Sequence, residues 1–129
     1  MAGYTKLNLT EDVEDFAPKF GMGEVLQAHI ARDAIEAKQF GLSLQRLKPN
    51  QRLPFGHRHE QQEEVYVVVG GSGRLKVEDE VLELAQWDAV RVDADVMRNF
   101  EAGPDGLDVL AFGAPGVRDT EQEMGWWTD

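Results

Sequence analysis

Short runs of alternating apolar and polar residues follow one another along most of the chain, and turn-forming residues separate them. A period of two places the apolar side chains on one face of a strand. None of these runs is long enough to indicate a long helix. The pattern therefore predicts seven or eight short strands in an all-β sandwich or barrel. The predicted strands cover residues 25–30, 40–47, 63–70, 73–79, 81–84, 87–92, 99–102 and 107–112.

The length of 129 residues fits one domain with a single hydrophobic core. The absence of cysteine excludes disulfides, thiolate metal sites and thiol catalysis. With 24 acidic and 13 basic residues the net charge is -11, so nucleic acid and anionic membranes are repelled and neither is expected as a partner. No N-terminal apolar run resembles a signal peptide or a membrane span, so a cytoplasmic location is the default expectation.

The predicted N-terminal arm, residues 1–23, contains one helix signal. Thr10 is a good N-cap residue, and Glu11 and Asp12 place acidic side chains where the first helical turn favours them. We expect a short helix over residues 11–17, ended by Pro18.

The predicted C-terminal tail, residues 114–129, loses the alternating pattern and contains Trp126 and Trp127. Two adjacent tryptophans expose a large apolar area if they lie in water. We expect them to pack on the barrel or on a second subunit; the alternative is a flexible chain end.

The strongest candidate for a functional site begins with His57 and His59. On a strand, residues two apart point to the same face, so these imidazoles can meet at one place, and Glu64 and Tyr66 share a face further along. Two imidazoles and one carboxylate are ligand types for zinc, iron, nickel or manganese. The competing interpretation is a solvent-exposed loop that carries two histidines.

This stretch resembles the first motif of the cupin superfamily, G-x5-H-x-H-x3,4-E-x6-G. His57 and His59 match its histidines, Glu64 its glutamate and Gly71 its closing glycine. Asn50 stands where cupins often have glycine, and asparagine is the other residue that best tolerates a positive φ. The resemblance covers about residues 41–113. It implies a cupin double-stranded β-helix, a jelly-roll-like barrel, over residues 24–113.

Glu63 also fits the motif at the shorter spacing, with Gly70 as the closing glycine. We prefer Glu64 because Gly71, Ser72 and Gly73 look like the usual turn after this motif.

The second cupin motif, G-x5-P-x-G-x2-H-x3-N, is degenerate in residues 87–100. Trp87 replaces its first glycine, Asp93 its proline and Asp95 its second glycine. Arg98 replaces the histidine that the resemblance implies as a fourth metal ligand, and an arginine carries a permanent positive charge.

Arg98 leaves three alternatives open. In the first, Arg98 swings away and a metal binds to His57, His59 and Glu64. In the second, it pairs with Glu64 in a metal-free pocket. In the third, it binds a carboxylate or phosphate of a ligand. Tyr66 is a further candidate for contact with a ligand.

Two classes of function are compatible with these residues. The first is a small cupin that binds a small molecule in the barrel, with or without a divalent metal held by His57, His59 and Glu64. The second is a metal-dependent enzyme of the dioxygenase, isomerase or epimerase type. No organic cofactor is expected in either class.

A homodimer is also expected. The predicted strand 25–30 lies at an edge, where an unpaired strand favours a symmetric partner, and this strand commonly pairs across a dimer interface in cupins. His29, within this strand, is expected at a surface or an interface rather than in a metal site.

Overall fold

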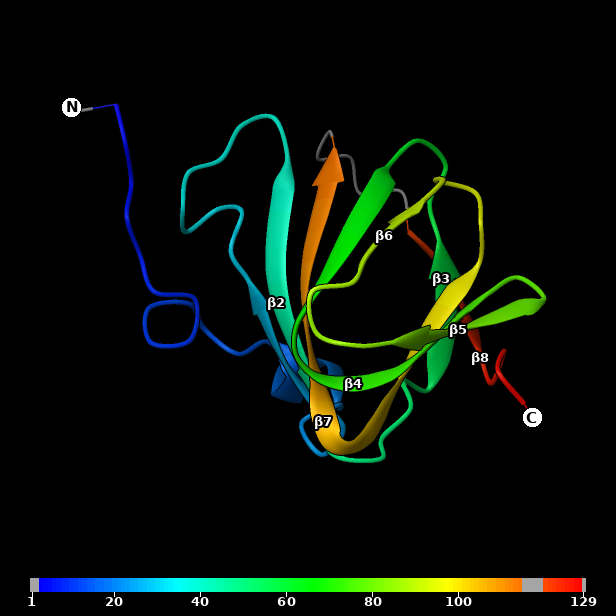
Figure 1. Cartoon of the computed structure of the whole chain (residues 1–129). Coiled ribbons are helices and arrows are strands. Elements are labelled where there is room, and N and C mark those ends of the chain that lie inside the picture. Colours follow the sequence, from blue (N-terminus) through cyan, green and yellow to red (C-terminus); the bar gives the residue numbers. More distant parts are fainter. Residues whose placement is uncertain (1–2, 115–119, 129) are drawn as a thin grey trace.

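The structure is a computed structural model that describes residues 3–114 and 120–128. In these ranges the chain is almost entirely β-structure, curled into a barrel (Figure 1). This confirms the predicted all-β barrel. The elements are the 3₁₀ helix η1 (Ala17–Phe20) and the strands β1 (Leu26–Ile30), β2 (Gly41–Leu47), β3 (Phe55–Arg58), β4 (Glu63–Val77), β5 (Glu80–Leu84), β6 (Ala89–Val92), β7 (Arg98–Ala114) and β8 (Glu121–Met124).

Two long antiparallel strands, β4 and β7, form the central pair of the barrel. Their pairing extends from Glu63 opposite Ala114 to Val77 opposite Arg98. The other strands attach to this pair. Strand β2 pairs with β7, and β1 pairs with the other edge of β2. Strands β5 and β6 both pair with β4, whereas β3 pairs with β7 and with β8.

The glycines after the first motif bend a strand and do not form the expected turn. The β4–β7 register shifts on both sides of Gly71, which has a φ of 70°. A Cβ at Gly71 would lie 2.0 Å from the carbonyl oxygen of Gly106, so only glycine fits without a backbone shift. The predicted strands 63–70 and 73–79 are therefore one bulged strand, β4. Likewise, 99–102 and 107–112 belong to one strand, β7.

The predicted helix at residues 11–17 is wrong. A single turn forms there instead, held by the Asn8 side chain, which accepts hydrogen bonds from the amides of Thr10 and Glu11. The short helix begins later, at Ala17, with Pro18 in its first turn and Gly21 in the left-handed C-cap conformation. Proline suits a first turn because the amide that it lacks has no helical partner there.

The outer edge of β1 is partly covered by the chain itself. The Phe16 amide donates to the carbonyl of Ala28, and the Asp15 carboxylate accepts from the Ala28 amide. His29 is buried, not on the surface, and its Nδ1 lies 2.8 Å from the carbonyl oxygen of Val13. This covering reduces the exposed edge on which the expected homodimer was based, and the homodimer remains a prediction.

The interior of the barrel is filled by apolar side chains from most of its strands. Representative core residues are Leu26 of β1, Leu47 of β2, Val68 of β4, Leu84 of β5, Val92 of β6 and Val109 of β7. Within residues 3–114 and 120–128, no helix has the length and apolarity needed to cross a membrane.

Candidate functional site

Strands β3, β4 and β7 bring five polar side chains together, which we call the Glu64 cluster. His57 lies on β3 opposite Arg98, the first residue of β7, so both side chains project from the same face. Glu64 and Tyr66 are two apart on β4 and share a face. His59 lies just beyond the end of β3, and its amide donates to the carbonyl of Ala94.

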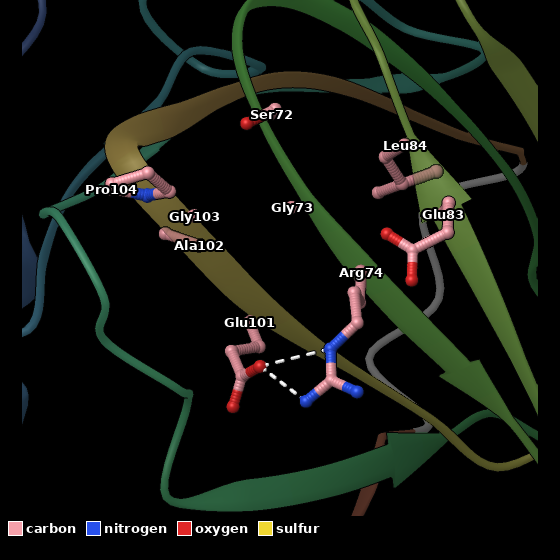
Figure 2. A pocket seen from close by; sticks show the side chains of 9 residues that line it. All are labelled: Ser72, Gly73, Arg74, Glu83, Leu84, Glu101, Ala102, Gly103 and Pro104. Carbon is pink, nitrogen blue, oxygen red and sulfur yellow. Dashed lines mark hydrogen bonds and ion pairs between the residues drawn. The ribbon is translucent and has the colours of Figure 1, made fainter.

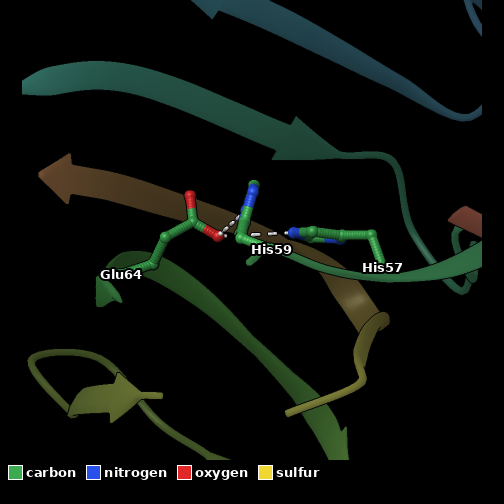
Figure 3. A group of neighbouring side chains, drawn as sticks. All are labelled: His57, His59 and Glu64. Carbon is green, nitrogen blue, oxygen red and sulfur yellow. Dashed lines mark hydrogen bonds and ion pairs between the residues drawn. The ribbon is translucent and has the colours of Figure 1, made fainter. Parts of the chain in front are cut away.

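One carboxylate oxygen, Oε1 of Glu64, is the centre of this cluster. The Nε2 atoms of His57 and His59 lie 3.3 and 3.0 Å from it (Figure 3). The hydroxyl of Tyr66 donates to the same oxygen at 2.6 Å. Because an ionised carboxylate only accepts hydrogen bonds, each imidazole presents its Nε2–H to Glu64. The other carboxylate oxygen, Oε2, accepts no hydrogen bond from residues 3–114 or 120–128.

Arg98 is fully buried beneath this carboxylate. Its Nη2 lies 3.5 Å from Glu64 Oε1, and its Nε donates to the Tyr66 hydroxyl at 3.1 Å. Its Nη1 donates to the carbonyls of Val96 and Ala94 at 2.8 and 3.3 Å. Of the alternatives for Arg98, the structure therefore has the pairing with Glu64. These contacts hold the guanidinium beside Glu64.

The surroundings keep Glu64 ionised. Burial by itself raises the pKa of a carboxyl group, but the hydrogen bonds from His57, His59 and Tyr66 outweigh burial and hold the pKa of Glu64 well below its ordinary value. Burial lowers the pKa of His57, which favours the neutral imidazole. Burial and the Glu64 charge raise the pKa of the Tyr66 phenol, which therefore stays protonated. The buried negative charge of Glu64 is paired with the positive charge of Arg98.

Thr120 completes the surroundings of His59, and no sequence pattern indicated it. Its Oγ1 lies 3.3 Å from His59 Nδ1. The corresponding Nδ1 of His57 is buried and has no hydrogen bond within the described residues, and the same is true of Arg98 Nη2. The two histidines thus differ in the support that their second ring nitrogen receives.

The donor positions suit a divalent metal. One ligand atom from each of His57, His59 and Glu64 lies within 4.8 Å of the others, as the motif predicted. Such sets of imidazole and carboxylate donors bind zinc and related ions. If His59 held a metal through Nε2, its Nδ1–H would donate to Thr120 Oγ1, which is the second hydrogen bond typical of metal-ligating histidines.

The charge of Arg98 opposes a metal at this place. An ion about 2.2 Å from Glu64 Oε1 would be at most about 5.7 Å from Arg98 Nη2, because that nitrogen is 3.5 Å from the same oxygen. At an effective dielectric constant of ~20, the repulsion is then at least about 6 kcal/mol, or roughly four decades of affinity. The positions of the three donor atoms suit a metal ion, but the positive charge of the buried Arg98 opposes its binding.

Two positions assigned to motif glycines have the backbone conformation of glycine. Asn50 has a φ of 63° and Trp87 a φ of 74°. Positive φ is unusual for residues with a side chain, and for a bulky tryptophan it carries strain. At these two positions the chain therefore adopts the left-handed conformation that glycine favours.

A separate surface hollow lies between β4, β5 and β7 (Figure 2). Its lining includes Ser72, Arg74, Leu84, Glu101 and Pro104, and none of the Glu64 cluster.

Comparison with known proteins agrees with this architecture. The family model described as a cupin domain matches residues 43–110. No curated protein sequence matches the chain.

Solved structures with the same fold are distant in sequence. A cupin protein from Bacteroides fragilis is 23% identical with a TM-score of 0.73, over 92% of this chain and 89% of that one. A sugar phosphate isomerase of the cupin superfamily from Silicibacter pomeroyi is 17% identical with a TM-score of 0.72, over 93% and 92%. An oxalate decarboxylase variant from Bacillus subtilis is 16% identical with a TM-score of 0.76; the alignment covers 95% of this chain but 33% of the decarboxylase. These likenesses concern the fold.

Proposed function

Because the chain belongs to the cupin-domain family, we propose that it binds a small molecule at the Glu64 cluster without a metal. The observation that carries this proposal is the set of three hydrogen-bond donors at Oε1 of Glu64, together with the guanidinium of Arg98 3.5 Å from the same oxygen. They hold the carboxylate ionised and fixed in orientation, and its charge is balanced by Arg98. A preorganised, charge-balanced group of this kind can bind a ligand without first rearranging.

The ligand chemistry is set by the remaining carboxylate oxygen. Oε2 of Glu64 accepts nothing from the described residues, and an ionised carboxylate attracts hydroxyl or N–H donors and repels anions. The Glu64 side chain is 13% exposed and that of His57 16%, so the cluster reaches the solvent on one side. We assign it a hydroxylated small molecule, such as a sugar or a sugar derivative, with one hydroxyl donating to Oε2.

Arg98 and Tyr66 take positioning roles in this proposal. Both are buried, at 0% and 3% exposed. They act on the ligand through Glu64: Tyr66 donates to Oε1, and Arg98 donates to the Tyr66 hydroxyl and supplies the compensating charge.

The test is a binding measurement with three probes: glucose, glucose 6-phosphate and oxalate. Protein-observed NMR titration at millimolar probe concentrations suits weak binding. We expect shifts with glucose, loss of these shifts in Glu64→Gln, and unchanged shifts in the control Glu63→Gln; glucose 6-phosphate and oxalate are anions and should bind more weakly than glucose. Glu63 is a matched control because it neighbours Glu64 but pairs with the exposed Arg91. Equal binding by wild type and Glu64→Gln, or binding of oxalate alone, would contradict the assignment.

A metal-dependent enzyme of the dioxygenase, isomerase or epimerase type is the second candidate. The observation that favours it is the convergence of His57, His59 and Glu64. A divalent ion bound by these residues would polarise an oxygen of the substrate. Elemental analysis of protein purified without a histidine tag separates the two candidates. A stoichiometric metal content would support the enzyme, and a lack of metal would support the metal-free binding site.

A further inference from the structure

The last described segment, residues 120–128, runs along β3 and not away from the barrel (Figure 1). Its strand β8 pairs with β3 at four positions, from Phe55 opposite Met124 to Arg58 opposite Glu121. By contrast, β3 pairs with β7 at one position, His57 opposite Arg98. Most of the ladder that fixes the backbone of His57 therefore comes from the C-terminal segment.

The same segment reaches His59 through Thr120. The Thr120 hydroxyl lies 3.3 Å from Nδ1 of His59, while Nε2 of this histidine faces Glu64. A hydrogen bond at one ring nitrogen fixes the orientation of the ring. It also decides whether the other nitrogen carries a proton or a lone pair. Both histidines of the cluster thus depend on residues 120–124 for their placement.

Apolar burial within β8 does not hold this strand on the barrel. All four of its residues, Glu121–Met124, are exposed. The contact between Arg58 and Glu121 lies at the surface, where such pairs contribute little. The residues after β8 must therefore hold the segment in place.

Trp127 is the buried residue of this segment. It is 5% exposed, whereas every residue of the preceding strand is exposed. The guanidinium carbons of Arg52 and Arg74 lie 4.2 and 5.1 Å from the centroid of its ring, and Arg52 also donates to its carbonyl oxygen at 3.0 Å. Arginine over an indole ring is a favourable cation–π contact.

Glu101 of β7 fixes both arginines. It accepts from Arg74 through Nε and Nη2, and this pair is visible at the edge of the surface hollow (Figure 2). Its second oxygen lies 2.7 Å from Arg52. The ring of Trp127 therefore contacts side chains that are held to the central β4–β7 pair.

Trp126 adds a second contact over β3. A Cβ at Gly56 would lie 2.7 Å from this ring, so the glycine lets the ring lie directly on the strand. The ammonium of Lys76 lies 4.6 Å from its centroid.

We propose that Trp127 is a positioning residue for the Glu64 cluster: it anchors the C-terminal segment, β8 then holds β3, and His57 and His59 take their places. The segment forms one wall of the site from outside the barrel core. The effect of this anchor on ligand binding rests on the proposed function, whereas its effect on β3 and β8 does not.

The test compares Trp127→Ala with Trp87→Ala by hydrogen–deuterium exchange of the full chain, read by mass spectrometry. Trp87 is a matched control because it is 71% exposed. We expect exchange in peptides covering residues 55–58 and 120–125 to become at least about tenfold faster in Trp127→Ala and to stay unchanged in Trp87→Ala. Peptides from the centre of β4 and β7 should keep their protection, and Trp127→Phe should restore most of the protection of β3 and β8.

Unchanged exchange in β3 and β8, or equal acceleration in every strand, would overturn the proposal. If Trp127→Ala does not fold, Arg52→Gln tests the same anchor, because it removes the cation at the ring and the donor to the Trp127 carbonyl without emptying the space under the ring. Glucose is titrated into the same variants, and we expect about tenfold weaker binding in Trp127→Ala. If the wild type binds no hydroxylated probe, the proposed function fails, and the exchange measurement still decides the role of Trp127.

Discussion

Replacement of Arg98 by a neutral residue should turn the Glu64 cluster into a metal site. The charge of Arg98 opposes a divalent ion by at least about 6 kcal/mol at an effective dielectric constant of ~20, given the 3.5 Å between its Nη2 and Glu64 Oε1. Arg98→Met removes this charge without adding a ligand, so zinc affinity should rise by about four orders of magnitude. Arg98→His should raise it further, because an imidazole at this position adds a fourth donor.

In the absence of metal, both Arg98 variants should be less stable than the wild type. Arg98 donates hydrogen bonds to the Tyr66 hydroxyl and to the carbonyls of Val96 and Ala94, and it balances the buried charge of Glu64. Removal of one partner from a buried ion pair costs about 3 to 5 kcal/mol. Metal should return part of this loss, since a ligand at a hundredfold excess over its dissociation constant adds about 2.7 kcal/mol.

The assay is calorimetric zinc titration together with melting temperatures in zinc and in chelator. Arg91→His is the control for a new histidine, because Arg91 is exposed and lies outside the cluster. We expect a metal-dependent increase in melting temperature in both Arg98 variants and a small one in wild type and in Arg91→His. Zinc binding in folded Arg98→Met and Arg98→His that is no tighter than in wild type would refute the electrostatic reasoning.

Three further predictions concern backbone, pH and assembly. Gly71→Ala should lower the free energy of unfolding by more than about 3 kcal/mol in chemical denaturation, because the new Cβ would lie 2.0 Å from a carbonyl oxygen. Gly21→Ala is the control: Gly21 has a similar φ of 74° but no atom within 4 Å of the new Cβ, so this substitution should cost much less. Since the pKa of Glu64 is lower in the folded than in the unfolded chain, its ionised form stabilises the fold above about pH 4.3 and this stabilisation is lost as the pH falls. The melting temperature should thus decrease less between about pH 6 and pH 3 in Glu64→Gln than in wild type, and parallel curves would contradict this. Light scattering at tens of micromolar should give the mass of a homodimer, whereas the mass of one chain would refute the dimer.

The cluster could be predicted in part because its spacing is local. His57 and His59 are two apart, and the alternation of β4 makes Glu64 and Tyr66 share a face. The spacing of the first cupin motif joined the histidines to Glu64, although the strand that carries His57, β3, was not among the predicted strands. The place of Arg98 could be inferred from its motif position, but its orientation could not, because that depends on carbonyls that only the folded chain assembles.

Other features were not predictable for physical reasons. Strand β8 has no alternating apolar pattern, since all its residues are exposed, and it forms through pairing with a strand that is distant in the sequence. Residues 70–73 have the composition of a turn, yet the bulges there keep the ladder intact. At the N-terminus, Thr10 has the local signature of a helix start, but Asn8 forms the hydrogen bonds of the turn and Pro18 favours a helix that begins next to it.

The continuity of β4 and β7 also bears on how the chain reaches its native state. Strand β4 bends at Gly71 opposite Leu107 of β7, and the other strands attach on both sides of this bend, so one continuous ladder joins the two parts of the barrel. Most of this ladder joins residues that are far apart in the chain, such as Glu63 and Ala114. Chains dominated by such distant pairings close large loops before they gain contacts, and they fold in milliseconds to seconds rather than microseconds. The central β4–β7 pair should therefore unfold cooperatively, whereas β3 and β8 can open locally, and folding requires β4 and β7 to find their register across the bend at Gly71.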